Sequence, residues 1–189
     1  MFFSDQDIKS ARESGDLVIE PFSEQNLQAA SYDITLASDI KIPQATGLIY
    51  GEQLKHHNVT IPDTGYVLDP GQFILAATVE RVRLSPGIGA QVMGRSSWGR
   101  RGLSIHITAG WVDPGWDGVL TLELHNCGPA PVLLLPGARI GQLVFGATFT
   151  DSAKPYHGRY WGAKGVESVK LAGPDEGVVG DLREAPVSY

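Results

Sequence analysis

The chain has 189 residues, of which 42% are hydrophobic and 19% charged, so it is long enough for one compact domain with a core of its own. Its net charge of −6 excludes broad electrostatic binding to nucleic acid or to an anionic membrane, because both favour a basic excess. No run approaches the roughly 20 apolar residues that span a bilayer, and the first residues lack a secretory pattern. We therefore expect a cytoplasmic protein.

Cys127 is the only cysteine, which excludes an intrachain disulfide and predicts a small buried or half-buried residue.

The N-terminal residues predict the one clear helix of the chain, from Ser4 to Gly15. Ser4 and Asp7 have the spacing of a capping box. Ile8 and Ala11 supply an inward-facing stripe, and Gly15 can end the helix.

Short β-rich runs follow the helix, and glycine and proline separate them. The predicted strands are residues 17–19, 31–36, 66–68, 73–79, 88–93, 103–108, 119–124, 132–135 and 139–147. Pro-Gly pairs predict tight turns at residues 69–71, 85–87, 113–115 and 135–137. Residues 43–62 lack periodicity and predict a long loop with room for one hairpin. The regular separation of short β-rich runs by glycine and proline favours an all-β sandwich or barrel over alternating helices and strands. We expect one domain over residues 1–165 and an acidic tail over residues 166–189.

Residues 94–102 concentrate three arginines, two serines and three glycines. Glycines let the backbone approach a phosphate, while serine hydroxyls and arginine guanidinium groups bind its oxygens. Taken alone, however, the run is more typical of a solvated basic loop.

Two further segments carry polar groups on predicted strands and turns. In the strand 103–108, Ile105 and Ile107 share one face, whereas His106 and Thr108 share the other. Asp113 is typical of a turn-initiating residue, and it is equally able to accept a sugar hydroxyl. In the strand 119–124 the leucines share one face, so Glu123 must point away from the core; by itself this pattern favours a surface glutamate.

Together these segments resemble the dCTP deaminase family, part of the dUTPase-like group. The shared motifs are Gly-Arg-Ser-Ser-Trp-Gly-Arg-Arg-Gly-Leu at 94–103, Thr-Ala at 108–109, Asp-Pro-Gly-Trp-Asp-Gly at 113–118 and Leu-Glu at 122–123. Residues 28–33 and 136–143 also match, so the resemblance spans about residues 4–165. It implies a dUTPase-like distorted jelly roll, or β-clip barrel, with one short N-terminal helix. It also implies a homotrimer whose active sites lie between subunits, with dCTP as substrate.

The resemblance also implies roles for single residues. Glu123 is the acid and base, and Ser96 and Arg100 line the reacting base and hold the water. Nucleotide binding falls to Arg95, Ser97, Trp98, Gly99, Thr108, Ala109, Asp113, Thr121, Leu122, Gln142, Tyr156, Arg159 and Lys164. The sequence departs from the family in the C-terminal segment, where Arg159 replaces a lysine and Ala163 replaces a glutamine.

No zinc site is expected, because the other large class of nucleotide deaminases needs a Cys-x-x-Cys pair and this chain has a single cysteine. His56 and His57 are more typical of loop residues than of metal ligands. Mg²⁺ is expected only as the ion that arrives with the triphosphate.

Three alternatives to simple conversion of dCTP into dUTP and ammonia stay open. One is a bifunctional enzyme that releases dUMP and pyrophosphate, the subgroup that residues 108–111 and Gln142 resemble; we expect dUTP by a small margin. A plain dUTPase is disfavoured, because Trp116 stands where that enzyme has a tyrosine. A non-catalytic nucleotide-binding relative is disfavoured, because Ser96, Arg100 and Glu123 are all present.

Overall fold

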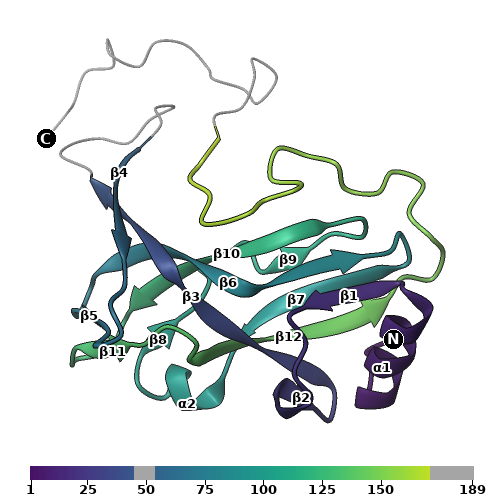
Figure 1. The fold of residues 1–189 in the computed structure, drawn as a ribbon, viewed down its shortest axis with the longest axis horizontal. Helices are drawn as coiled ribbons and strands as arrows, with labels where there is room; N and C mark the ends of the chain where they lie inside the picture. Colours follow the sequence, from purple (N-terminus) through teal and green to yellow (C-terminus); the bar gives the residue numbers. More distant parts are fainter. Residues whose placement is uncertain (45–53, 171–189) are drawn as a thin grey trace, which may run out of the picture.

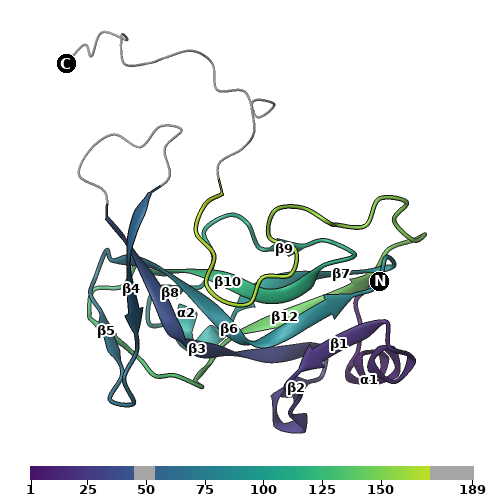
Figure 2. The same ribbon diagram turned by 45° about the horizontal axis from the view of Figure 1, so that its top comes forward.

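The computed structural model describes residues 1–44 and 54–170, which form a curled antiparallel sheet with short helices at its edges (Figures 1 and 2). The helices are α1 (Asp5–Ser14), α2 (Ser96–Gly99) and the 3-10 turn η1 (Glu24–Asn26). The strands are β1 (Leu17–Glu20), β2 (Leu27–Gln28), β3 (Ser31–Gln44), β4 (Lys55–Thr60), β5 (Tyr66–Leu68), β6 (Phe73–Leu84), β7 (Ile88–Gly94), β8 (Leu103–Ser104), β9 (Trp111–Val112), β10 (Asp117–Asn126), β11 (Val132–Leu134) and β12 (Arg139–Ala147).

The main sheet has the strand order β8-β10-β6-β3-β12-β7-β9. β1 also pairs with β6, and β2 and β4 also pair with β3, while β5 and β11 form a separate pair. Neighbours in this order are often far apart in the sequence, as the contact of β3 with β12 shows. The mainly β architecture confirms the predicted fold class.

The core lies on the inner face of the curled sheet, and β10 shows how the sequence selects that face. Leu120, Leu122 and Leu124 are buried, whereas Thr121 and Glu123 between them are half-buried on the other side. This is the alternation expected of a strand with one apolar face. The predicted orientation of Glu123 away from the core is confirmed.

Local signals predicted the helix and the turns correctly. Ser4 and Asp7 form the capping box of α1, and Gly15 ends it in the left-handed conformation with a φ of 80°. At each of the four Pro-Gly turns a backbone N–H donates to the carbonyl three residues earlier, at 3.0 to 3.1 Å. Within residues 1–44 and 54–170, no helix is long and apolar enough to cross a membrane.

The structure differs from the sequence predictions in the extent of some elements. The strand 103–108 ends at Ser104, and Ile107 is 49% exposed instead of facing the core with Ile105. In the region 43–62, β3 continues to Gln44 and pairs with β4, which is the hairpin that the sequence allowed for; residues 45–53 lie outside the described part of the chain. Helix α2 adds a second short helix to the single one expected.

Two further expectations concern the end of the chain and the cysteine. Cys127 is exposed, contrary to prediction, because it directly follows the last residue of β10. At the start of the predicted tail, Val166 is 9% exposed and Glu167 N donates to Thr121 Oγ1 at 3.0 Å. The domain boundary near residue 165 stays a prediction, and residues 171–189 lie outside the described chain.

Candidate active site

A pocket of about 500 Å³ lies over the outer face of β10. Thr121 and Glu123 of β10 line it, together with the aromatic residues Trp111, Trp116 and Tyr156. The rings of Trp116 and Tyr156 pack with centroids 5.6 Å apart. The pocket therefore combines a carboxylate with flat aromatic surfaces, which suit a planar ring with polar edges.

The Glu123 carboxylate is held by the segment that follows β8. Oε2 accepts a hydrogen bond from the backbone N–H of Ile107 at 2.7 Å. The backbone N–H of Glu123 in turn donates to the carbonyl of Ile105 at 3.0 Å. Because the chain crosses over Glu123 here, residues 105–107 cannot continue as a strand. The half-buried carboxylate thus has one fixed oxygen, and no described residue hydrogen-bonds to the other.

His106 lies in the same pocket, and the sequence gave it no role. Its Nδ1 is buried and has no hydrogen-bond partner within residues 1–44 and 54–170. Gly110 leaves the space that this ring occupies, because a Cβ there would lie 3.0 Å from His106 Cε1. The only sequence signal for His106 was its place on the face opposite Ile105 in the predicted strand.

Asp113 lines the pocket and occupies the first position of a tight turn. Its carbonyl accepts from Trp116 N at 3.1 Å, which closes the turn, and its exposed carboxylate accepts from Trp111 Nε1 at 2.8 Å. Both interpretations of Asp113 from the sequence therefore remain open, because it starts a turn and also presents a carboxylate to the pocket.

The segment after β12 runs back along the beginning of β10. Tyr156 N donates to Pro114 O at 2.7 Å, Gly162 N to Asp117 O at 2.7 Å, and Val119 N to Ala163 O at 2.9 Å. Gly118 permits this approach, because its φ is 149° and an added Cβ would lie 2.8 Å from Ala163 N. The segment after β12 is thereby fixed beside β10 (Figure 2), and its residues Tyr156, Tyr160 and Ala163 line the pocket.

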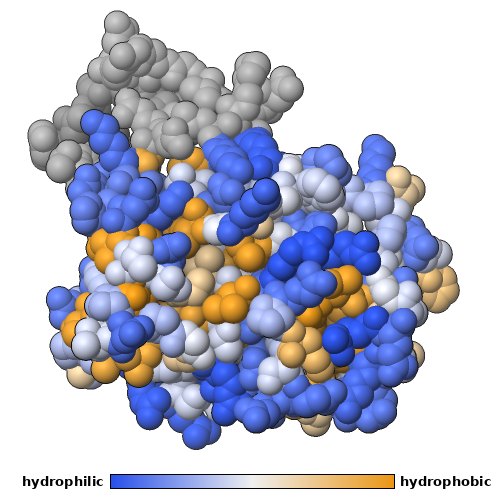
Figure 3. Space-filling view, viewed as in Figure 1, coloured by the Kyte–Doolittle hydropathy of each residue, from blue (hydrophilic) through white to orange (hydrophobic). Residues whose placement is uncertain are grey.

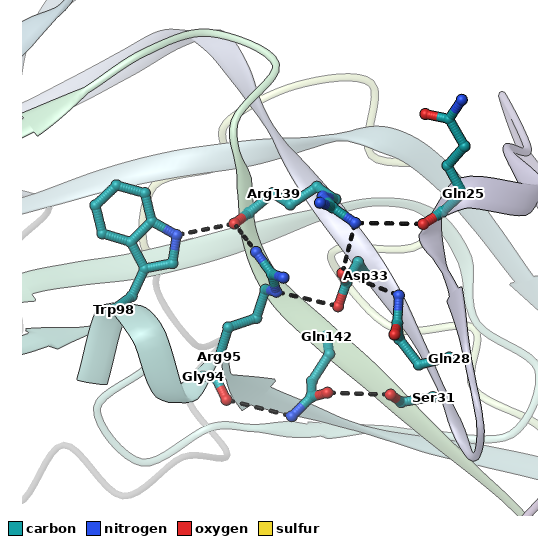
Figure 4. A network of polar contacts seen from close by, with 9 residues as sticks. All are labelled: Gln25, Gln28, Ser31, Asp33, Gly94, Arg95, Trp98, Arg139 and Gln142. Atoms are coloured by element: carbon teal, nitrogen blue, oxygen red, sulfur yellow. Dashed lines mark hydrogen bonds and ion pairs between the residues drawn. The ribbon is translucent and has the colours of Figure 1, made fainter. Parts of the chain in front are cut away.

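Arg95 and Trp98 of the arginine-rich run belong to a second group of polar contacts (Figure 4), and neither residue lines the pocket. Arg95 and Trp98 both donate to the carbonyl of Arg139, at 3.1 and 2.8 Å. The guanidinium groups of Arg95 and Arg139 flank Asp33, with N–O distances of 3.3 and 3.5 Å. Asp33 is 1% exposed, and burial raises the pKa of its carboxyl group, although both arginines oppose that shift.

Gln142 extends this network. Its Oε1 accepts from Ser31 Oγ at 3.0 Å, and its Nε2 donates to Gly94 O at 3.3 Å (Figure 4). The predicted binding residue Gln142 therefore joins β12 to β3 and to the end of β7, directly before α2.

The predicted site residues therefore fall into separate groups, according to whether they line the pocket. Those that line the pocket are Ala109, Asp113, Thr121, Glu123 and Tyr156. Those in or near α2 and outside the pocket are Arg95, Ser96, Ser97, Trp98, Gly99, Arg100 and Gln142. Leu122 has its side chain in the core, so only its backbone can face a ligand. Thr108, Arg159 and Lys164 are exposed and do not line the pocket.

Several residues near these groups were missed by the sequence reasoning. The pocket also holds His106, Trp111 and Tyr160, and the arginine network also holds Asp33 and Arg139. No group of three or more His, Cys, Asp or Glu residues able to hold a metal ion occurs in the described ranges.

The geometry defines a mainly β protein with a pocket that suits a small planar ligand with polar edges. The family model described as dCTP deaminase-like matches residues 2–148. The chain therefore belongs to the dCTP deaminase family.

Relatives with two different names are about equally similar. A protein of Methanosphaera stadtmanae named "dCTP deaminase, dUMP-forming" is 37% identical over 182 residues, covering 89% of this chain and 92% of that protein. A protein of Haloarcula marismortui named "dCTP deaminase" is 38% identical over 190 residues, covering 93% and 97%.

A solved structure shows the same fold. The crystal structure of 2'-deoxycytidine 5'-triphosphate deaminase from Agrobacterium tumefaciens is similar with a TM-score of 0.62 and 22% identity; the match covers 76% of this chain and 47% of that one. The expected deaminase fold is therefore confirmed.

Proposed function

We propose that the chain hydrolyses the amino group of dCTP, so that dCTP and water give dUTP and ammonia, and that it acts in the cytoplasm. The observation that carries this proposal is the half-buried Glu123 carboxylate in an aromatic pocket, with one oxygen held at 2.7 Å by Ile107 N–H. Membership of the dCTP deaminase family and the names of the relatives support the same substrate.

Glu123 moves the protons of this reaction. Its carboxylate takes a proton from the water that bonds to C4 of the cytosine, and it delivers a proton to N3. Glu123 then passes the proton of the new C4 hydroxyl to the amino group, the C4–N bond breaks to release ammonia, and the C4 carbonyl of uracil forms. A positioned acid and base of this kind contributes about 10²–10⁴-fold to the rate. Ile107 N–H keeps one oxygen in place, so the other is the proton carrier.

Ser96 and Arg100 complete the site from a neighbouring subunit of a homotrimer. Both lie on or beside α2 and outside the pocket of Glu123 in the same chain. A cyclic assembly brings one surface of each protomer against a different surface of the next, which can join the two halves. This arrangement supports active sites between subunits.

The triphosphate needs cations, and the chain supplies them around α2. Arg95 uses Nε for Asp33 and Nη1 for Arg139, so Nη2 has no hydrogen bond to a described residue. Lys164 is exposed and available to close over phosphate. Mg²⁺ is commonly bound by substrate phosphates with one or two carboxylates, of which the pocket can supply Glu167. When bound, it would neutralise part of the phosphate charge.

Release of dUMP and pyrophosphate is the second candidate. The specific observation is that relatives named dUMP-forming are as similar as those named dCTP deaminase. This reaction needs a second water at the α-phosphate, for which Asp113 is the available carboxylate. We place dUTP first, because Arg159 and Ala163 depart from the family segment that closes on the phosphates.

A time course from labelled dCTP with Mg²⁺ tests both candidates. Ammonia and dUTP rising together are the expected result. If dUMP and pyrophosphate form in step with ammonia and without free dUTP, the second candidate is correct. Binding of dCTP without any ammonia would instead identify a non-catalytic relative.

A further inference from the structure

The indole of Trp111 is fixed at two points although it is 55% exposed. Its Nε1–H donates to Asp113 Oδ1 at 2.8 Å. Its six-membered ring lies over Gly89 of β7, where an added Cβ would be 2.6 Å from Cη2 and 2.7 Å from Cζ2. Because Gly89 has no side chain, the ring can lie directly against its backbone. The pairing of β9 with β7 holds the backbone of Trp111 at this place.

This hydrogen bond leaves one carboxylate oxygen of Asp113 available. An indole N–H can only donate, and the Asp113 carboxylate is the acceptor that it finds here. Within residues 1–44 and 54–170, no side chain or backbone group hydrogen-bonds to Oδ2. The backbone of Asp113 is fixed as well, because its carbonyl closes the turn with Trp116 N at 3.1 Å. Trp111 and Asp113 both line the pocket that holds Glu123.

The chemistry of the substrate identifies the partner of the free oxygen. The sugar of a 2′-deoxynucleoside triphosphate has one free hydroxyl, at the 3′ position. A carboxylate oxygen accepts a hydroxyl proton well, and a charge-assisted hydrogen bond is stronger than a neutral one. A carboxylate that rotates freely would lose part of this gain as conformational entropy, whereas one already held by an indole does not.

We infer that Trp111 is a positioning residue, which orients Asp113 so that Oδ2 accepts the 3′-hydroxyl of the bound nucleotide. This inference rests on the proposed function. It adds a residue that contributes to recognition of the sugar. Trp111 does not touch the hydroxyl itself and acts only by orienting Asp113.

Binding of two nucleotides that differ only in this hydroxyl tests the inference. The probes are dCTP and 2′,3′-dideoxycytidine triphosphate, both with Mg²⁺, measured by calorimetry in the Glu123→Gln background to prevent turnover. The parent should bind dCTP about tenfold more tightly, as expected for one hydrogen bond to a charged group. Trp111→Phe keeps a ring over Gly89 but removes the N–H, and the preference should fall to about twofold or less.

Gly89→Ala provides a second variant that keeps the indole N–H but displaces the ring. It should lose the preference for dCTP as Trp111→Phe does, while Asp113→Asn sets the value for a site without the carboxylate. A merely structural role for Trp111 would weaken both nucleotides equally and leave their ratio unchanged, and that result would overturn the inference. Ammonia release by the wild-type chain is measured separately; its absence would overturn the proposed function, whereas the ratio still reports on Trp111.

Discussion

Glu123 shows how a common residue type becomes a candidate acid and base through its surroundings. A glutamate on the polar face of a strand is ordinarily solvated. The alternation of apolar and polar residues along β10 predicts only such a solvated position for Glu123. Here the chain after β8 turns over that face, and the Ile107 N–H donates to the carboxylate at 2.7 Å. The contact depends on a crossing of two segments sixteen residues apart, so strand periodicity could place Glu123 outside the core but not inside a pocket.

Glu123→Gln should remove deamination while keeping the fold. The amide oxygen can still accept from Ile107 N–H, but an amide cannot take up and return protons, so ammonia release should fall by about 10²-fold or more. Circular dichroism and thermal unfolding should match the wild type. The control is Glu20→Gln, which removes an exposed strand carboxylate paired with Arg81 and should retain activity within about twofold. Substantial ammonia release by Glu123→Gln would remove Glu123 from its role.

At the scale of elements, helix α2 is held by ion pairs to the buried Asp33 and not by its own length. It has four residues, and its N-cap residue Arg95 makes no capping hydrogen bond with its side chain. Instead Arg95 reaches Asp33, and Arg95 and Trp98 share the carbonyl of Arg139 (Figure 4). Isolated helices this short are not stable, so tertiary contacts must fix the position of the residues that α2 presents.

Asp33→Asn should therefore loosen α2. The change leaves two guanidinium groups without their buried counter-charge and should lower the free energy of unfolding by about 2 kcal/mol. Urea unfolding measures it. Asp39→Asn is the matched control, because Asp39 accepts from Thr60 Oγ1 in an exposed pair and its loss should cost about 0.5 kcal/mol or less. Equal losses for the two variants would contradict the anchoring role of Asp33.

Glu80 on β6 predicts a pH dependence of stability. It is 2% exposed and accepts from Thr35 N and Thr35 Oγ1, yet burial raises its pKa. Since the folded state holds the proton more tightly, this contribution to stability is complete below the pKa of an unfolded glutamate and is lost as pH rises through the raised folded pKa. The unfolding free energy of Glu80→Gln relative to the wild type should therefore increase with pH. A constant difference from acid to neutral pH would show that Glu80 does not titrate as its burial implies.

The elements also show where sequence reasoning succeeded. The α1 cap and the Pro-Gly turns were predictable, because they depend on residues within a few positions of one another. Strand ends were less predictable, because they depend on partners far away: β3 reaches Gln44 because β4 pairs with it, and β8 stops at Ser104 because the chain then crosses Glu123. Helix α2 had no periodic signal, since four residues are barely one turn.

At the scale of the whole molecule, the candidate site is in two parts. Glu123 and the aromatic residues line one pocket, whereas Ser96 and Arg100 belong to the α2 region outside it. The sequence predicted both sets from a family resemblance, but no property of one chain shows which copy supplies which set. The face drawn in Figure 3 also exposes hydrophobic patches between hydrophilic ones. The exposed large apolar side chains include Val67, Met93, Ile107 and Leu133, which a trimer could bury.

Subunit mixing distinguishes a shared site from a site within one chain. Glu123→Gln and Arg100→Ala should each be inactive alone. If a site takes Glu123 from one protomer and Arg100 from its neighbour, every trimer that contains both variants has one intact site and two defective ones, whichever variant supplies two of the subunits. Co-expression with two affinity tags, followed by two-step purification that removes the homotrimers and an ammonia assay, should therefore recover about a third of wild-type activity per site. Mixing the separately purified proteins without subunit exchange is the control and should give none. If the co-expressed heterotrimers are as inactive as either parent, the two sets of residues do not meet across a subunit boundary.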